Sequence, residues 1–233
     1  MPRIELPISK SIANRLLILQ AIHGDGLMTV SADLPEDVLI LHNALTTLRT
    51  FKTSKTLPTP HINVGTCGTA MRFLTAYCAQ LDGTTVILDG VERMRHRPIG
   101  QLVDALREIG AQIDYLGEEG YPPLRITGCI LDKQRLVTIN NPQSTQFVSA
   151  LPLIGANVHT DSTSPYITLT RILIENYLQR SDLQGIDARS TAQRSAEEIL
   201  HQDFSACPDL YPAVALTCER LGVELHATGT ESL

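Results

Sequence analysis

The stretch that organises this sequence is Gly65–Leu74, which reads GTCGTAMRFL. It follows a short strand-like run, His61–Val64, and apolar residues at helical spacing follow it. Glycines at a strand-to-helix junction let a ligand approach the backbone, and the first N–H groups of the helix remain free to bind an anion. Arg72, one turn into the helix, adds a full positive charge. The pattern predicts an anion site, although a tight turn that only needs glycine has the same signature.

The composition is that of an ordinary globular protein. The chain has 233 residues, 43% hydrophobic content, only 4% aromatic content and a net charge of −6, which argue against a nucleic-acid-binding surface. No apolar run approaches the roughly 20 residues of a membrane span, and the first residues do not resemble a signal peptide. The five cysteines are widely spaced and form no C-x-x-C pair, so neither a disulfide framework nor a zinc site is indicated. We therefore expect a cytoplasmic protein without nucleic-acid or membrane partners.

The junction at Gly68 has counterparts elsewhere in the chain. A small or polar turn also precedes an apolar helix at Ser9–Ser11, at Gln143–Gln146 and at Cys207–Leu210. We interpret these as a loose internal repeat of βαβ-type units whose helix N-termini converge on one site. The flanking strands are expected at residues 3–8, 27–30, 84–88, 112–116, 124–128 and 135–139, and a polar loop is expected at 50–60.

The first helix start carries charge suited to an anionic ligand. Lys10 lies at the helix mouth, and Ser11 and Arg15 are spaced i, i+4 and therefore share one face. A phosphate or carboxylate at the helix start would meet all three side chains. Solvated surface charge is the alternative interpretation.

A basic segment precedes the helix that we expect at 101–109. Arg93, Arg95 and Arg97 alternate before Pro98, so on an extended backbone their side chains would share one face. Three like charges held together need an anion. A solvated basic loop is the alternative, and His96 is interpreted as a plain loop residue.

Two later helix starts carry polar side chains. Ser144, Thr145 and Gln146 offer hydroxyls and an amide that suit a phosphate, although plain N-capping explains the same triplet. Asp209 is either a helix-start carboxylate or a general base whose pKa nearby cations set. The sequence has no metal-ligand cluster and no Walker-type phosphate loop, so no metal, nucleotide or other cofactor is indicated.

Taken in order, these motifs resemble the 5-enolpyruvylshikimate-3-phosphate (EPSP) synthase family. The resemblance runs from about residue 5 to residue 178 and resumes near residue 200. It is carried by six stretches: Ser9–Arg15, Gly68–Arg72, Arg93–Gly100, Ser144–Phe147, Ser164–Ile167 and Pro208-Asp209.

The resemblance implies an α/β (α+β) fold. Members have two globular domains built from repeated βαβαββ units, with helix N-termini directed at the cleft between the domains. This chain is shorter than members of the family, so we expect the second domain to be incomplete. The predicted organisation is a shikimate-3-phosphate-side domain at 1–178 and a partial second domain at 179–233 that carries the Asp209 helix start.

The resemblance also implies a reaction. Family members transfer the enolpyruvyl group of phosphoenolpyruvate to the 5-hydroxyl of shikimate 3-phosphate, in the shikimate pathway of aromatic amino acid biosynthesis. The transfer proceeds through a tetrahedral intermediate without a metal or organic cofactor. Glyphosate inhibits it, and the unsubstituted Gly68 leaves room for that inhibitor. The family also implies a monomer.

The matching positions give each site residue an expected role. Asp209 and Lys10 are the expected catalytic residues, with Asp209 accepting the proton of the attacking hydroxyl. The residues expected to bind shikimate 3-phosphate are Ser11, Arg15, Ser144, Thr145, Gln146, Thr163 and Tyr166. Those expected to bind phosphoenolpyruvate are Lys10, Gly68, Arg72, Arg97 and Gln146.

Two departures from the family pattern surround Gly68. Thr66-Cys67 stands where members commonly have Asn-Ala, which removes an amide, and Phe73 stands where many have Pro. The cations and glutamate of the family's second half are also absent. Two alternatives therefore stay open: an incomplete fragment that only binds shikimate 3-phosphate, and a relative of the UDP-N-acetylglucosamine enolpyruvyl transferases. Ser9–Ser11 and Arg97–Gly100 argue against the latter.

Overall fold

The structure is a computed structural model that describes residues 9–30, 34–53, 59–183, 199–203, 205, 215 and 224–229. The chain divides into two compact units, Met1–Ser162 and Thr163–Leu233, which are described separately. The division after residue 178 that the resemblance implied stays a prediction.

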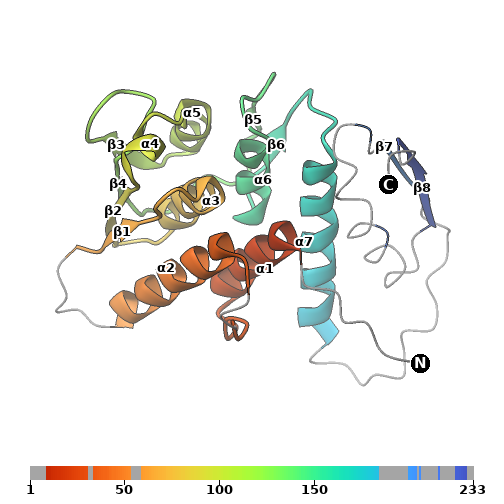
Figure 1. Ribbon diagram of the computed structural model, residues 1–233, viewed down its shortest axis with the longest axis horizontal. Helices are drawn as coiled ribbons and strands as arrows, with labels where there is room; N and C mark the ends of the chain where they lie inside the picture. The colour runs from red at the N-terminus through yellow and green to blue at the C-terminus, as the bar shows by residue number, and fades with distance from the viewer. Residues whose placement is uncertain are drawn as a thin grey trace. The chain divides into compact units, whose positions relative to one another are not determined.

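The first unit begins with two helices and continues with alternating strands and helices (Figure 1). Its elements are α1 (Lys10–His23), α2 (Glu36–Thr53), β1 (His61–Asn63), α3 (Gly68–Ala79), β2 (Thr85–Asp89), α4 (Glu92–Arg95), α5 (Gly100–Glu108), β3 (Gln112–Tyr115), β4 (Leu124–Thr127), β5 (Val137–Thr138), α6 (Thr145–Leu153) and β6 (Val158–His159). The described part of the second unit consists mainly of α7 (Pro165–Leu183), β7 (Ile199–Asp203) and β8 (Glu224–Thr228), and the two strands pair in parallel.

The main sheet of the first unit has the strand order β1-β2-β4-β3. β1 and β2 are parallel, whereas β4 is antiparallel to both β2 and β3. Residues 61–127 therefore form one βαβαββ unit, with the short α4 as an addition. A second βαβ segment follows, in which β5 and β6 pair in parallel around α6. The expected α/β class is confirmed.

One face of this sheet is apolar because alternate residues of each strand are buried. Two rows of side chains cross the strands in register: Ile62, Leu88 and Leu124 in one, and Val86, Ile126 and Ile113 in the other. Helices α3 and α5 pack on the sheet from one side (Figure 1). Burying these rows fixes the register, since a slip by one residue would turn them to the opposite face.

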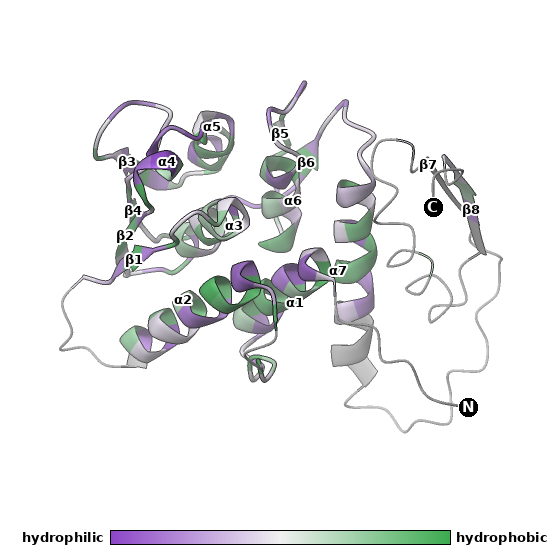
Figure 2. Ribbon diagram, viewed as in Figure 1, coloured by the Kyte–Doolittle hydropathy of each residue, from purple (hydrophilic) through white to green (hydrophobic). Residues whose placement is uncertain are grey.

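Helix α3 is the centre of the first unit. Every residue from Ala70 to Ala79 is buried, because α3 packs against the sheet and also against α1, α2 and α6. A helix enclosed in this way needs small or apolar residues all round. The outer helix α2 differs: hydrophobic and hydrophilic residues alternate along it (Figure 2), and its buried side includes Val38, Leu41 and Leu45.

Three local predictions were wrong. Leu27–Val30 forms no strand, and its Met28 N–H donates instead to the side-chain oxygen of Gln20 at 3.0 Å. The polar loop expected from residue 50 begins later, because α2 continues to Thr53. The segment 91–100 is not extended, since α4 coils residues 92–95 into a helical turn. The strand expected at residues 3–8 lies outside the described residues.

Gly128, which follows β4, is in close contact with the end of α3. A Cβ at this position would overlap the carbonyl of Leu81 and lie 2.9 Å from the carbonyl oxygen of Cys78. Because these are backbone atoms, Gly128→Ala should lower the free energy of unfolding by about 1–3 kcal/mol. Gly26→Ala is the matched control, since a Cβ there has no neighbour within 4 Å. Urea denaturation curves with equal midpoints for the two variants would contradict this packing.

Candidate anion-binding site

The parallel strands β1 and β2 end side by side, and each leads into a helix start. Asn63 lies opposite Asp89 in the register. The Val64 N–H donates to the Asp89 carbonyl at 2.9 Å, and the Val91 N–H donates to the Gly65 carbonyl at 3.2 Å. These bonds hold the two loops together. Ligands of open α/β sheets bind at this edge, where the strands end.

The turn into α3 is closed by side chains that the family resemblance did not lead us to expect. Gly65 has a positive φ of 57°, and its N–H donates to the Asn63 side chain at 2.8 Å. The Cys67 sulfur caps α3 by accepting from the Ala70 N–H at 3.3 Å. Burial raises the pKa of the Cys67 thiol to about 11, so the cap is neutral at physiological pH. The Cys67 departure therefore leaves the helix start capped and uncharged.

Two arginines converge on Gly68. A Cβ added there would overlap Nη1 of Arg72 and lie 2.7 Å from Nη1 of Arg97. Arg72 also approaches the Pro98 carbonyl at 3.5 Å, and Arg97 the Thr66 carbonyl at 3.4 Å. Within the described part of the chain, no carboxylate lies within 4 Å of either guanidinium. Two like charges thus share one glycine at a helix N-terminus, where the helix dipole adds further positive potential.

Arg72 is the more enclosed of the two arginines. Arg72 is 8% exposed, its guanidinium lies over the Phe147 ring at 5.4 Å, and its Nε has no hydrogen-bond partner among the described residues. Burial, and then the charge of Arg97, lower the pKa of Arg72 to about 10. Arg72 therefore stays charged at neutral pH. An anion beside Gly68 would compensate both charges.

Lys10 stands at the start of α1, as predicted. Its Nζ lies 3.6 Å from a carboxylate oxygen of Asp37 in the first turn of α2, and its side chain is 61% exposed. The backbone carbonyl of Asp37 also accepts a hydrogen bond from the Cys67 thiol, at 3.8 Å. The start of α2 is therefore joined to those of α1 and α3. An exposed pair of this kind contributes little to stability, so Lys10 remains available to a ligand.

Arg15 links α1 to α6. It is 2% exposed, and it donates to the Ser11 carbonyl at 2.9 Å and to the Ser149 hydroxyl at 3.2 Å. Its guanidinium lies 5.4 Å from the centre of the Phe73 ring. The expected shared face of Ser11 and Arg15 is confirmed. Phe73, the second departure from the family pattern, packs against this arginine.

The start of α6 is joined to the starts of α3 and α5. The Ser144 hydroxyl caps α6 by accepting from the Gln146 N–H at 3.3 Å, so the plain capping role exists. The Gln146 amide also donates to the Thr69 hydroxyl at 2.7 Å, and the Gln143 N–H donates to the Gln101 side chain at 2.9 Å. Gln146 therefore joins the start of α6 to the start of α3, which carries Gly68.

The structure brings together most of the predicted site residues. In the first unit, the predicted site residues at or within two turns of a helix start are Lys10, Ser11, Arg15, Gly68, Arg72, Ser144, Thr145 and Gln146, and Arg97 lies in the loop between α4 and α5. Thr163 and Tyr166 belong to the second unit, at the start of α7, and Asp209 lies outside the described residues.

Sequence reasoning missed two residues at this site. Thr69 is small and unremarkable in the sequence. Asp37 carried a signal, because Pro35-Glu36-Asp37 is typical of a helix start, but nothing local placed it beside Lys10.

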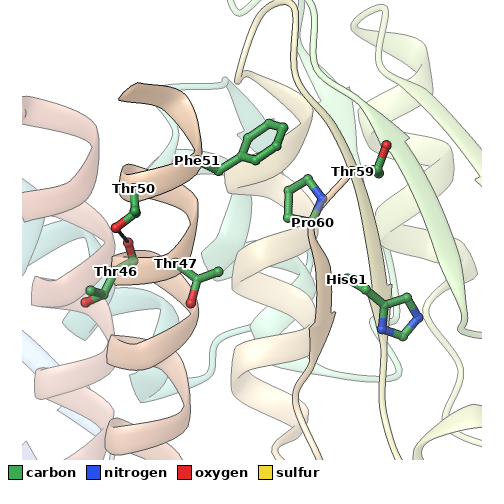
Figure 3. Close-up of a pocket in the computed structure, with 7 residues that line it drawn as sticks. All are labelled: Thr46, Thr47, Thr50, Phe51, Thr59, Pro60 and His61. Atoms are coloured by element: carbon green, nitrogen blue, oxygen red, sulfur yellow. Dashed lines mark hydrogen bonds between the residues drawn. The ribbon is translucent and has the colours of Figure 1, made fainter. Parts of the chain in front are cut away.

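A hollow in the described surface lies elsewhere (Figure 3). It measures about 530 Å³ and separates the end of α2 from the approach to β1. Thr46 and Thr50 line it, but their hydroxyls donate to helix carbonyls at 2.9 and 3.0 Å. The described residues that line the hollow include no arginine, no lysine and no predicted site residue. We therefore assign the anion site to the helix starts, because positive charge gathers there, and not to this hollow.

Nowhere among the described residues do three or more His, Cys, Asp or Glu side chains gather as a metal site would require. No described helix has the length and apolar character needed to cross a bilayer.

A comparison with known protein families identifies the family of this chain. Residues 2–216 match the family described as "EPSP synthase (3-phosphoshikimate 1-carboxyvinyltransferase)". The chain belongs to the EPSP synthase family.

Several relatives of this EPSP synthase family member come from bacteria. A 3-phosphoshikimate 1-carboxyvinyltransferase of Bacteroides fragilis (strain ATCC 25285) is 39% identical over 227 residues, covering 92% of this chain and 52% of the relative. The Cellvibrio japonicus enzyme of the same name is 38% identical over 197 residues, covering 75% and 46%. The solved EPSP synthase of Acinetobacter baumannii matches with a TM-score of 0.54 at 20% identity, covering 89% of this chain and 52% of that one. The chain thus spans about half the length of the curated relatives it matches.

Burial and raised pKa values predict that the cysteines near α3 react slowly with thiol reagents. The pKa of Cys67 is about 11 and that of Cys78 about 12, in both cases because burial disfavours the thiolate. At pH 8 we expect both to stay unlabelled by a maleimide in the folded protein, while the partly exposed Cys129 is labelled. Peptide mass spectrometry distinguishes the three, and labelling after urea unfolding is the control. Rapid labelling of Cys67 would contradict its role as a buried cap.

Proposed function

We propose that this chain binds phosphoenolpyruvate and shikimate 3-phosphate, and that it serves the transfer of the enolpyruvyl group between them. One observation carries the proposal: the Arg72 and Arg97 guanidiniums converge on Gly68 at the start of α3, and no carboxylate of the described residues lies beside them. Both substrates carry a phosphate, which suits paired guanidiniums and oriented N–H groups.

The phosphoenolpyruvate phosphate is assigned to Lys10, the Gly68 N–H, Arg72 and Arg97. The convergence of two guanidiniums on the α3 start supports this assignment. Gln146 is assigned to the same substrate, and its bond to Thr69 supports a position beside that helix start. Charges fixed by the fold stabilise a dianion without reorganisation when it binds.

Shikimate 3-phosphate is assigned to the neighbouring helix starts. The bonds of Arg15 to Ser11 and Ser149 support a role for α1 and α6 together. The residues proposed for this substrate are Ser11, Arg15, Ser144, Thr145, Gln146, Thr163 and Tyr166.

The proposed reaction is an addition followed by an elimination. The 5-hydroxyl oxygen of shikimate 3-phosphate bonds to C2 of phosphoenolpyruvate, and a carboxylate, for which we propose Asp209, takes the hydroxyl proton. In the same addition C3 takes up a proton from solvent. C3 then gives a proton back to solvent while the bond between C2 and the phosphate oxygen breaks, which restores the double bond and releases inorganic phosphate. We propose that these steps need no metal or cofactor. We also propose that the protein is a monomer and acts in the cytoplasm.

Binding without turnover is a second candidate function. The observation that favours it is that the match covers only 52% of the length of the Bacteroides fragilis relative. Calorimetric titration with shikimate 3-phosphate, followed by phosphoenolpyruvate and an assay of released phosphate, separates the two candidates. Binding with phosphate release supports transfer, binding alone supports the second candidate, and no binding rejects both.

Loss of either proposed phosphate-binding cation should weaken phosphoenolpyruvate binding. A hydrogen bond to a charged group is worth about 1.5–3 kcal/mol, so Lys10→Met or Arg97→Ala should raise the dissociation constant roughly 10- to 150-fold and abolish turnover where turnover exists. Arg93→Ala is the control, because it removes an exposed arginine from the same loop. Unchanged affinity in Lys10→Met or Arg97→Ala would reject the assignment.

A further inference from the structure

A buried carboxylate with three hydrogen bonds lies beside the anion site and outside the assigned residues. Asp89 ends β2, and its side chain is 7% exposed. One oxygen accepts from the Gly90 N–H at 2.7 Å and from Arg95 Nε at 3.0 Å, while the other accepts from Arg95 Nη2 at 2.7 Å. Such a two-pronged arginine–carboxylate pair fixes direction as well as distance.

This pair determines where the α4 turn lies. Arg95 is the last residue of α4, and its partner Asp89 belongs to the rigid sheet. The turn is held at a second point by Met94, which is 1% exposed. A Cβ on Gly90 would lie 2.6 Å from the Met94 Cβ, so the two backbones approach closely. The loop is therefore fixed on both sides of Arg95.

Arg97 follows directly from this fixed turn. Its N–H donates to the Met94 carbonyl at 2.9 Å, and its guanidinium then reaches the Thr66 carbonyl and Gly68. Arg95 points instead to Asp89, with Glu92 3.7 Å away. Pairing with Asp89 thus separates two cations that the sequence places two residues apart.

We propose that Asp89, acting through Arg95, is a positioning residue that holds Arg97 over Gly68 and thereby sets the affinity of the site for its anion. The identity of that anion, phosphoenolpyruvate, rests on the proposed function. Burial acts to raise the pKa of Asp89, but the bonds from Arg95 and Gly90 outweigh it and hold the pKa below its usual value. The carboxylate is therefore charged at neutral pH.

The first test measures three variants: Asp89→Asn, Arg95→Gln and the double variant that combines these two changes. The control is Arg93→Gln, which removes a neighbouring exposed charge. Calorimetry measures the dissociation constants of phosphoenolpyruvate, with shikimate 3-phosphate present, and of shikimate 3-phosphate alone. Each single variant should weaken phosphoenolpyruvate binding about tenfold, and the double variant no further, because both act on one interaction. Arg93→Gln should match the wild type, and shikimate 3-phosphate affinity should not change.

Other outcomes would overturn the proposal. Additive losses in the double variant would mean that Asp89 and Arg95 act separately. Equal losses for both substrates, together with a lowered melting temperature, would mean a purely structural role. Because Arg95 is 44% exposed, Arg95→Gln should fold even where Asp89→Asn does not.

A second readout separates this proposal from the proposed function. The Nε–H signal of Arg97 in a nitrogen-15 spectrum, assigned by its loss in Arg97→Lys, should shift in Asp89→Asn and Arg95→Gln and stay in place in Arg93→Gln. A wild-type chain that binds neither substrate would reject the proposed function while this signal still reports the position of Arg97. An unshifted signal in both Asp89→Asn and Arg95→Gln would reject the positioning role.

Discussion

The repulsion between two guanidiniums at one glycine is the constraint on which the site depends. Arg72 and Arg97 meet at Gly68 without a carboxylate among the described residues. Such an arrangement is unfavourable unless the surrounding fold enforces it. Here α3 is buried on every side, and the loop before α5 is attached to the end of β2. The rigid packing of apolar residues therefore holds the two guanidiniums together at Gly68.

The departures from the family pattern fit into this packing. Cys67 replaces a residue at the mouth of α3, and its sulfur performs the capping that a hydroxyl or amide commonly provides. Phe73 lies against the buried Arg15, where its ring gives the guanidinium an apolar and π-rich neighbour. Both positions differ from the family pattern in residue type. Even so, Cys67 caps the start of α3, and Phe73 keeps α3 in contact with Arg15 of α1.

The sequence allowed the helix starts to be predicted, because glycine, serine and proline act locally at such positions. Lys10, Gly68 and Ser144 all stand where the pattern placed them. Partnerships between distant segments were not predictable in this way. Asp37 beside Lys10, Thr69 beside Gln146 and Asp89 beside Arg95 depend on which strands pair and which helices pack. The basic segment shows the same limit: the sequence predicted a loop whose arginines would share a face on an extended backbone, but residues 92–95 form a helical turn, which the bond to Asp89 and the buried Met94 accompany.

The uncompensated charges at Gly68 have an energetic consequence for the empty protein. The folded unit holds Arg72 and Arg97 closer than an unfolded chain would, so its stability is reduced by their repulsion. An anion that relieves this repulsion binds more tightly by a related amount. A substitution that placed a carboxylate beside Gly68 would stabilise the empty unit and, for the same reason, compete with its ligand. Stability and affinity are therefore opposed at this glycine, and the present sequence favours affinity.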